Sequence, residues 1–169
     1  SEYKKTFTYY ESKDGTMVPL TYFHRKDVEL NSETPVFLYG YGGYNISIRP
    51  SFSRKYVGWL ELGGVVAIAN LRGGGELGKK WHNAGRLKDK QNVFDDFLYA
   101  SKYLETEGVG NRKSTVISGR SNGGLLVGTS LVQNPNYFGA TLPAVGVLDM
   151  LRFTEFTEGW GWRGDYGSP

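Results

Sequence analysis

Cysteine is absent from this chain of 169 residues, so neither disulfide bonds nor thiolate metal ligands can contribute to it. No hydrophobic run approaches the roughly 20 residues of a membrane-spanning helix. Excess charge is small, because 20 basic and 17 acidic residues leave a net charge of +3, dispersed along the chain. These absences argue against a disulfide-stabilised scaffold, a membrane partner and a nucleic-acid partner. The first residues also lack a signal-peptide core, which favours a cytoplasmic protein and leaves a periplasmic or secreted one open.

Glycine and aromatic residues are abundant instead. The chain has 24 glycines, 12 tyrosines, nine phenylalanines and four tryptophans, and hydrophobic residues make up 39% of it. This composition is typical of a globular protein, and the length fits one domain with a buried core. The glycines suit an α/β protein with many tight loops, and the aromatic residues suggest an aromatic-lined pocket.

The most informative stretch is Gly119-Arg120-Ser121-Asn122-Gly123, which follows a β-branched run and precedes a leucine-rich segment. It matches the G-x-S-x-G nucleophile elbow, with a strand before the turn and a helix after it. Glycines are needed beside the serine because strand and helix pack closely there. The turn holds the hydroxyl over the first helical turn, whose free N–H groups can face an oxyanion. We therefore predict Ser121 as a nucleophile; the alternative is an ordinary serine in a glycine-rich turn.

Alternation of strands and helices indicates an α/β fold. Residues 4–11 and 17–25 are expected to pair as an antiparallel hairpin around the turn at 12–15. From residue 35 onward, apolar strands alternate with helices, as in a parallel sheet with right-handed crossovers. Further strands are expected at 35–40, 64–70, 115–118 and 139–147, helices at 51–62, 91–107, 122–133 and 148–156, and loops at 79–83 and 159–169. The sequence thus predicts a partial α/β-hydrolase fold, mostly parallel with an N-terminal antiparallel hairpin, and truncated before the last strands.

An oxyanion hole needs two hydrogen-bond donors. One is expected to be the backbone N–H of Asn122, the residue after the nucleophile. The other normally comes from the loop after the earlier strand, here Tyr41-Gly42-Gly43-Tyr44. Either a main-chain N–H of this loop or the Tyr41 hydroxyl could serve.

The stretch from Gly73 to Gly78 formally matches the G-x-G-x-x-G dinucleotide fingerprint. Residues 79–82 do not open the amphipathic helix that this fingerprint requires, so a glycine-rich loop near the catalytic face is the favoured interpretation. No Walker sequence and no zinc-ligand spacing occur. No cofactor and no metal are expected.

Five motifs resemble the catalytic domain of the prolyl oligopeptidase family, in the family's order and over nearly the whole chain. They are residues 37–47, 69–76, 90–97, 121–126 and 164–167. The resemblance implies a serine peptidase of α/β-hydrolase fold that cleaves short peptides after proline, with a β-propeller limiting substrate size. By position, it implies that Ser121 is the nucleophile and that the Tyr41 hydroxyl and the Asn122 N–H form the oxyanion hole.

The same resemblance implies a proline pocket. Its positions fall on Tyr44, where the family usually has phenylalanine, and on Val147, Trp162 and Tyr166. A flat proline ring gains from stacking on the Trp162 indole, and a pocket without charge favours proline over lysine. Related oligopeptidases with basic specificity differ after the serine and in the Tyr44 loop, so Asn122 and Tyr44 favour the prolyl branch. Without this pattern, Trp162 would be interpreted as a packing residue.

The catalytic triad is incomplete in this sequence. In this fold an acid and then a histidine follow the serine, whereas both histidines, His24 and His82, precede Ser121. The family has its acid and histidine beyond residue 169, and Asp149 and Asp165 lie too early to be that acid. The family's propeller and substrate-holding arginine are absent too. We expect residues 1–169 to be the first part of a catalytic domain, inactive alone, and unstable or associated without the rest of the same protein.

Two alternatives to a prolyl peptidase stay open. One is another α/β-hydrolase, such as an esterase or an aminoacyl-peptidase. The other is a non-catalytic binding module built on the same fold. The leading hypothesis predicts short proline-containing peptides as substrates.

Overall fold

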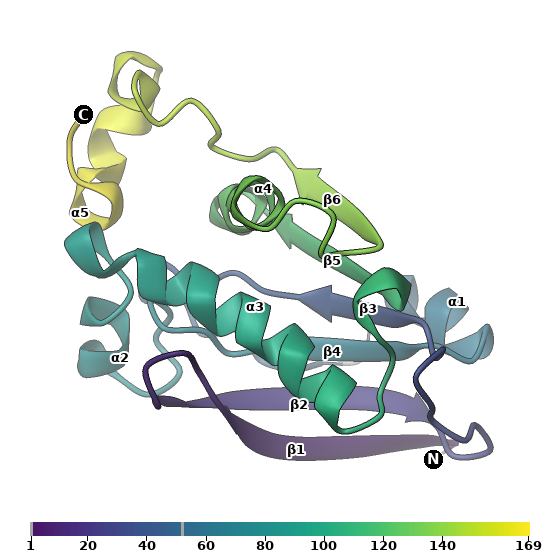
Figure 1. The fold of residues 1–169 in the computed structure, drawn as a ribbon. Coiled ribbons are helices and arrows are strands. Elements are labelled where there is room, and N and C mark those ends of the chain that lie inside the picture. Colours follow the sequence, from purple (N-terminus) through teal and green to yellow (C-terminus); the bar gives the residue numbers. More distant parts are fainter. Residues whose placement is uncertain (1, 52) are drawn as a thin grey trace.

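The computed structural model describes residues 2–51 and 53–169. Within these residues, six strands form one mixed sheet in the order β1-β2-β4-β3-β5-β6 (Figure 1). The strands are β1 (Tyr3–Glu11), β2 (Met17–Arg25), β3 (Val36–Tyr39), β4 (Val65–Ala69), β5 (Thr115–Arg120) and β6 (Ala140–Ala144).

The sheet is antiparallel on one side and parallel on the other. Strand β2 pairs antiparallel with both β1 and β4, whereas β4, β3, β5 and β6 are mutually parallel neighbours. The short central strands are largely buried, and every residue of β4 is buried. This arrangement confirms the predicted α/β class, with a mostly parallel sheet behind an N-terminal antiparallel hairpin.

Helices cover both faces of the sheet. The longer ones are α1 (Arg54–Glu61), α3 (Gln91–Thr106) and α4 (Asn122–Gln133). Helices α3 and α4 lie in front of the sheet in Figure 1, and α1 lies behind it. Phe97 of α3 packs with Leu38 and Ala67 in the main core, whereas Leu60 of α1 packs with Val66. Neighbouring residues of one strand thus face opposite helices, as the two-residue period of a strand requires.

Three predictions about the irregular segments were wrong. Residues 148–156 were expected to form a helix, but only the 3₁₀ turn η3 (Phe153–Glu155) forms there. Residues 79–83, expected to be a loop, form α2 (Lys79–Asn83), where the buried Trp81 indole donates to the carbonyl of Leu71 at 3.0 Å. The expected terminal loop contains η4 (Gly159–Trp162) and α5 (Arg163–Tyr166). In all three segments, tertiary contacts of aromatic side chains outweigh the local pattern.

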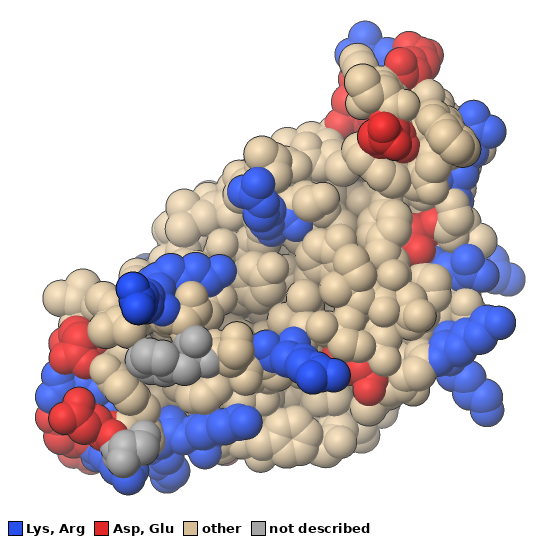
Figure 2. All heavy atoms as spheres, turned by 180° about the vertical axis from the view of Figure 1, so that it is seen from behind, with Lys and Arg blue, Asp and Glu red and all other residues tan. Residues whose placement is uncertain are grey.

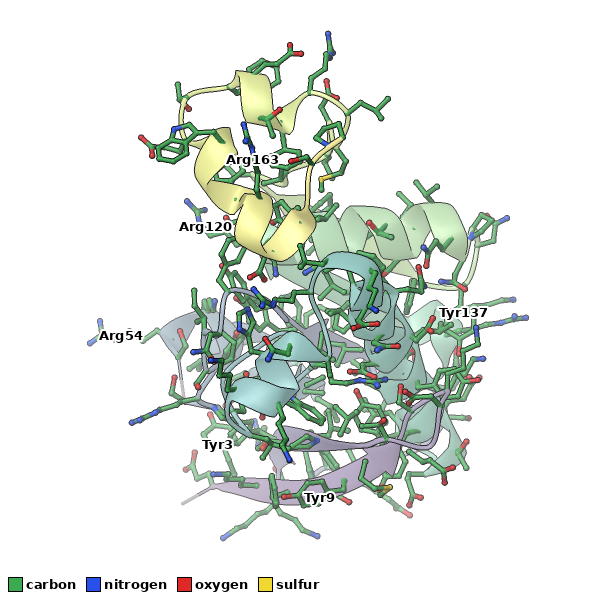
Figure 3. All side chains as sticks on the ribbon, turned by 90° about the vertical axis from the view of Figure 1, so that its left-hand side faces the viewer. Tyr3, Tyr9, Arg54, Arg120, Tyr137 and Arg163 are labelled. Atoms are coloured by element: carbon green, nitrogen blue, oxygen red, sulfur yellow. The ribbon has the colours of Figure 1, made fainter. Side chains whose placement is uncertain are left out.

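The terminal segment lies beyond the carboxyl ends of the parallel strands. In Figure 1 it stands at the same end of the sheet as α2 and the start of α3. Figure 3 looks onto this end, where Arg163 of α5 stands above Arg120, the last residue of β5. Elements that are distant in sequence therefore meet where the loop after each parallel strand begins.

Charged side chains are dispersed over the surface shown in Figure 2. Lys and Arg side chains stand in several separate places on the rear face, with wide uncharged areas between them (Figure 2). No helix in the part of the chain that the structure describes has both the length and the apolar character needed to cross a bilayer.

Candidate active site

The turn between β5 and α4 holds Ser121 in a strained conformation. Its φ is 59° and its ψ is −115°, a combination that L residues rarely adopt. The residue is exposed, and among the described residues its hydroxyl has no hydrogen-bond partner. A Cβ added to Gly119 would lie 2.2 Å from the carbonyl oxygen of Gly123, so the predicted need for glycine beside the serine is confirmed.

Asn122 connects the elbow to the loop after β3. As the first residue of α4 it has a backbone N–H without an intrahelical acceptor. Its buried side-chain amide donates to the carbonyl of Tyr41 at 2.7 Å. A Cβ on Gly43 would lie 2.4 Å from the same amide nitrogen, so glycine is needed for this approach. The structure thus brings together the two residues predicted to supply oxyanion donors.

The hydroxyl of Tyr41 stays protonated near neutral pH. Burial raises the pKa of this phenol above its ordinary value, and the phenol of Tyr39 and the carboxylate of Asp165 raise it further. A protonated phenol can donate a hydrogen bond, which is what an oxyanion requires.

Lys90, which the sequence reasoning missed, lies beside the same residues. Its ammonium donates to the carbonyl of Gly42 at 3.0 Å and to Oδ1 of Asn122 at 3.1 Å. The ammonium also lies 5.5 Å from the centre of the Tyr166 ring. Burial lowers the pKa of Lys90 to about 8, and the Asp165 carboxylate opposes that shift. The only sequence signal was its place in the motif at residues 90–97.

Asp165 anchors α5 to the loop after β3 and to α2. Its buried carboxylate accepts a hydrogen bond from the backbone N–H of Tyr44 at 2.7 Å and lies 2.9 Å from Nε2 of His82. Arg86 adds a 3.1 Å hydrogen bond to the carbonyl of Gly164. Among the described residues, His82 therefore faces Asp165 and forms no hydrogen bond with Ser121.

Two of the predicted pocket residues line one hollow. Val147 and Trp162 border a depression of about 260 Å³, with Phe153 and Phe156 beside them. Asp149 also borders it, and its carboxylate is bound by Arg152 at 2.6 Å. The lining of this depression is therefore largely apolar.

The other two predicted pocket residues touch each other and join this group through Phe153. The rings of Tyr44 and Tyr166 meet edge to face at 5.5 Å. Phe153 meets Tyr166 edge to face at 5.5 Å and stacks with Trp162 at 6.5 Å. The Tyr166 hydroxyl donates to Oδ1 of Asn122 at 2.9 Å, which links this aromatic group to the elbow. Phe153 was missed because it fell within a segment expected to be an ordinary helix.

Comparison with known proteins gives a consistent result. The model of the prolyl oligopeptidase family matches residues 50–169. A prolyl endopeptidase of Elizabethkingia meningoseptica is 48% identical over 160 residues, which are 95% of this chain and 23% of that protein. A prolyl endopeptidase of Dictyostelium discoideum is 45% identical over 170 residues, 99% of this chain and 22% of that protein. The chain therefore spans less than a quarter of the length of these relatives.

Solved structures agree over the whole chain. One from a study of two prolyl endopeptidases superimposes with a TM-score of 0.97 at 48% identity, covering 99% of this chain and 25% of that one. Prolyl oligopeptidase B from Galerina marginata gives a TM-score of 0.96 at 40% identity, with 99% and 24% covered. At 40–48% identity, the chain resembles these structures in sequence as well as in fold.

Proposed function

This chain belongs to the prolyl oligopeptidase family, and from that premise we propose that the protein carrying it is a serine peptidase that cleaves short peptides on the carboxyl side of proline. One observation carries the proposal. The strained and exposed Ser121 adjoins Asn122, which is hydrogen-bonded to both Tyr41 and Tyr166. The residues proposed as nucleophile, oxyanion donors and pocket wall are thus linked through Asn122.

In the proposed reaction, Oγ of Ser121 attacks the carbonyl carbon of the prolyl residue and forms a C–O bond. The π electron pair moves onto the carbonyl oxygen, which the Asn122 N–H and the Tyr41 hydroxyl stabilise. The serine proton passes to a histidine. The oxyanion then re-forms the C=O bond, the C–N bond breaks, and the leaving amine takes the proton from the histidine; water later hydrolyses the acyl-enzyme. No histidine follows Ser121 here, so we propose that residues outside 1–169 supply the histidine and its acid.

Proline specificity is supported by the character of the hollow. Trp162 and Val147 border it, and apolar walls favour an uncharged ring. Among the described residues that line the hollow, the carboxylate belongs to Asp149, which accepts a hydrogen bond from Arg152, and this bond also lowers its pKa. It is therefore already paired and is a poor partner for a substrate lysine.

The test uses the complete gene product that carries this chain. A Gly-Pro anilide and a simple acyl ester of similar size serve as substrates. Cleavage of the anilide, loss of that cleavage in Ser121→Ala, and labelling of Ser121 by a fluorophosphonate are expected. Ester hydrolysis without anilide cleavage would favour another α/β-hydrolase. Failure of both substrates and of the probe would favour a non-catalytic module.

We expect the isolated 169-residue chain not to cleave the anilide. Without a base, the hydroxyl of Ser121 has its ordinary weak nucleophilicity. Large apolar side chains are also exposed on α4 and after β6, Val132 to 79% and Leu151 to 80%. Post-proline cleavage by the purified chain would contradict this expectation, and size-exclusion chromatography would reveal self-association through these apolar side chains.

A further inference from the structure

Lys90 contacts three parts of the candidate site with its side chain. It is the residue immediately before α3, so its backbone is fixed by the helix start. Its ammonium reaches the carbonyl of Gly42 at 3.0 Å, Oδ1 of Asn122 at 3.1 Å and the face of the Tyr166 ring at 5.5 Å. One cation therefore binds the loop after β3, the start of α4 and the wall of the aromatic pocket.

This cation has no adjacent counter-charge. Among the described residues, no ion pair within 4 Å includes Lys90. Burial without a partner disfavours the charged form, which is why the pKa of Lys90 falls to about 8. A neutral side chain could fill the same space without that cost, so packing alone does not account for a lysine here.

The two carbonyl-type oxygens that Lys90 binds belong to the segments expected to hold the oxyanion. Gly42 follows Tyr41 directly, and the Asn122 side chain that accepts from Lys90 also donates to the carbonyl of Tyr41. Gly42 has a φ of 66°, and a Cβ there would lie 2.3 Å from Val93, so the loop has little freedom to compensate. Removing the ammonium would take one hydrogen bond from each segment and leave the bond from Asn122 to the carbonyl of Tyr41 as their direct link.

We propose that Lys90 is a positioning residue of the oxyanion hole, holding loop 41–43 against Asn122 and placing a positive charge behind the oxygen that becomes negative. The inference rests on the proposed peptidase function and deepens it. The ammonium is attracted by the Asp165 carboxylate but, among the described residues, forms no ion pair within 4 Å in the resting protein, and it gains a close counter-ion when the oxyanion forms. Such a charge stabilises the transition state more than the bound substrate.

The test compares Lys90→Met with Lys102→Met in the complete gene product. Lys102 is the matched control, because it lies on α3, which begins directly after Lys90, and its ammonium lies 4.6 Å from the Tyr99 ring, but it is exposed. The readouts are kcat and KM for the Gly-Pro anilide, and the affinities of two inhibitors. The first inhibitor is a peptide ending in prolinal. The hydroxyl of Ser121 adds to its aldehyde carbon, and the aldehyde oxygen then lies where the oxyanion forms. The matching pyrrolidine amide fills only the pocket.

In Lys90→Met we expect kcat and prolinal affinity each to fall about tenfold, less than the 10²–10³-fold loss that follows removal of an oxyanion donor itself. KM and the affinity of the pyrrolidine amide should stay within about twofold, because they depend on ground-state binding. Lys90→Arg, which retains the charge and the donors, should recover most of kcat. If the methionine variant does not fold, the kcat of Lys90→Arg is compared with that of the unmodified protein instead.

Equal behaviour of Lys90→Met and Lys102→Met would overturn the inference. So would an equal loss of affinity for both inhibitors together with a lower melting temperature, which is the pattern of a purely structural residue. Failure of Lys90→Arg to exceed the methionine variant would overturn it as well. The unmodified protein is assayed before any variant is made. If it does not cleave the anilide, the proposed function itself fails, independently of the role of Lys90.

Discussion

The carboxylate of Asp165 lies 2.9 Å from Nε2 of His82, and its second oxygen accepts a 2.7 Å hydrogen bond from the backbone of Tyr44. Only 4% of Asp165 is exposed. These contacts join α5, α2 and the loop after β3, which are far apart in sequence. Because Tyr166 follows Asp165 and packs against Tyr44, one carboxylate fixes two of the residues proposed to bind proline.

Asp165→Asn is therefore expected to weaken substrate binding. The amide oxygen can still accept from the Tyr44 N–H, but the NH2 group then meets Nε2 of His82, which must present a lone pair instead of a proton or lose the bond. An unsatisfied buried group costs about 1–3 kcal/mol, which corresponds to a rise in KM for the Gly-Pro anilide of about tenfold. The change in kcat should be smaller, because neither Tyr44 nor Tyr166 takes part in bond making. Steady-state kinetics of the complete gene product measure both quantities.

Asp27→Asn is the control for that substitution. Asp27 accepts two hydrogen bonds from Arg25, at 2.6 and 2.9 Å, but it is exposed and follows β2 instead of contacting α5 or the elbow. The same chemical change there should leave KM unaltered. An unchanged KM in Asp165→Asn would show that the carboxylate does not position the pocket.

Local patterns predicted the regular elements well. The strand expected at 17–25 is β2 with the same bounds, and the helix expected at 91–107 is α3 to within one residue. Both signals lie within the element itself, a two-residue alternation or a helical spacing of apolar side chains. The elbow was predictable for the same reason at Gly119, where a Cβ would meet Gly123 within the same five residues, whereas a Cβ on Gly123 would meet the distant carbonyl of Gly40 at 2.8 Å.

The supporting residues of the site could not be predicted in this way. Lys90 and Asp165 act through contacts with Gly42, Asn122 and Tyr44, and these pairs are separated by 32 to 121 residues. Such contacts depend on how the loops meet at the carboxyl edge of the sheet. Composition and periodicity do not specify the relative positions of these loops, which are seen only in the folded structure.

The backbone strain at Ser121 predicts an inverse relation between stability and activity. With φ at 59° and ψ at −115°, a Cβ is unfavourable at this position, whereas glycine adopts such angles freely. Ser121→Gly should be more stable than Ser121→Ala by about 1 kcal/mol, since relief of strain exceeds the extra entropy of the unfolded glycine chain. Both variants should lack peptidase activity. Denaturant unfolding of the two proteins measures the difference.

A helical site gives the opposite sign and so controls for glycine itself. At the exposed Lys102 of α3, glycine should be less stable than alanine by about 1 kcal/mol. If the glycine variant is less stable than the alanine variant at position 121 as well, a residue with a Cβ is not strained at the elbow.

The lowered pKa of Lys90 predicts a pH-dependent stability. Its pKa is about 8 in the folded protein, and the ordinary value is about 10.4. Between these values the unfolded chain binds a proton that the folded chain has released, so the free energy of unfolding rises with pH. The melting temperature of the unmodified protein, relative to Lys90→Met, should therefore rise from about pH 8 to about pH 10. Below about pH 8 the difference should be constant, and a constant difference throughout would contradict the burial of this ammonium.

The buried ion pair of Asp96 and Arg72 is expected to contribute strongly to the stability of this fold. Asp96 is fully buried and accepts hydrogen bonds from the guanidinium of Arg72 and from Ser12, both at 2.6 Å. Asp96→Asn leaves the buried guanidinium of Arg72 opposite a neutral amide, with the half-exposed Asp14 carboxylate at 2.6 Å as its remaining ion-pair partner, and it should lower the free energy of unfolding by about 3 kcal/mol.

The pair of Asp149 and Arg152 provides the comparison for Asp96→Asn, because its closest nitrogen–oxygen distance is also 2.6 Å. Its two side chains are 39% and 65% exposed, and water screens their attraction. Asp149→Asn should therefore lower the free energy of unfolding far less than Asp96→Asn does. Urea unfolding followed by tryptophan fluorescence measures both variants. Since the distances match, equal losses would mean that burial does not decide the strength of these pairs.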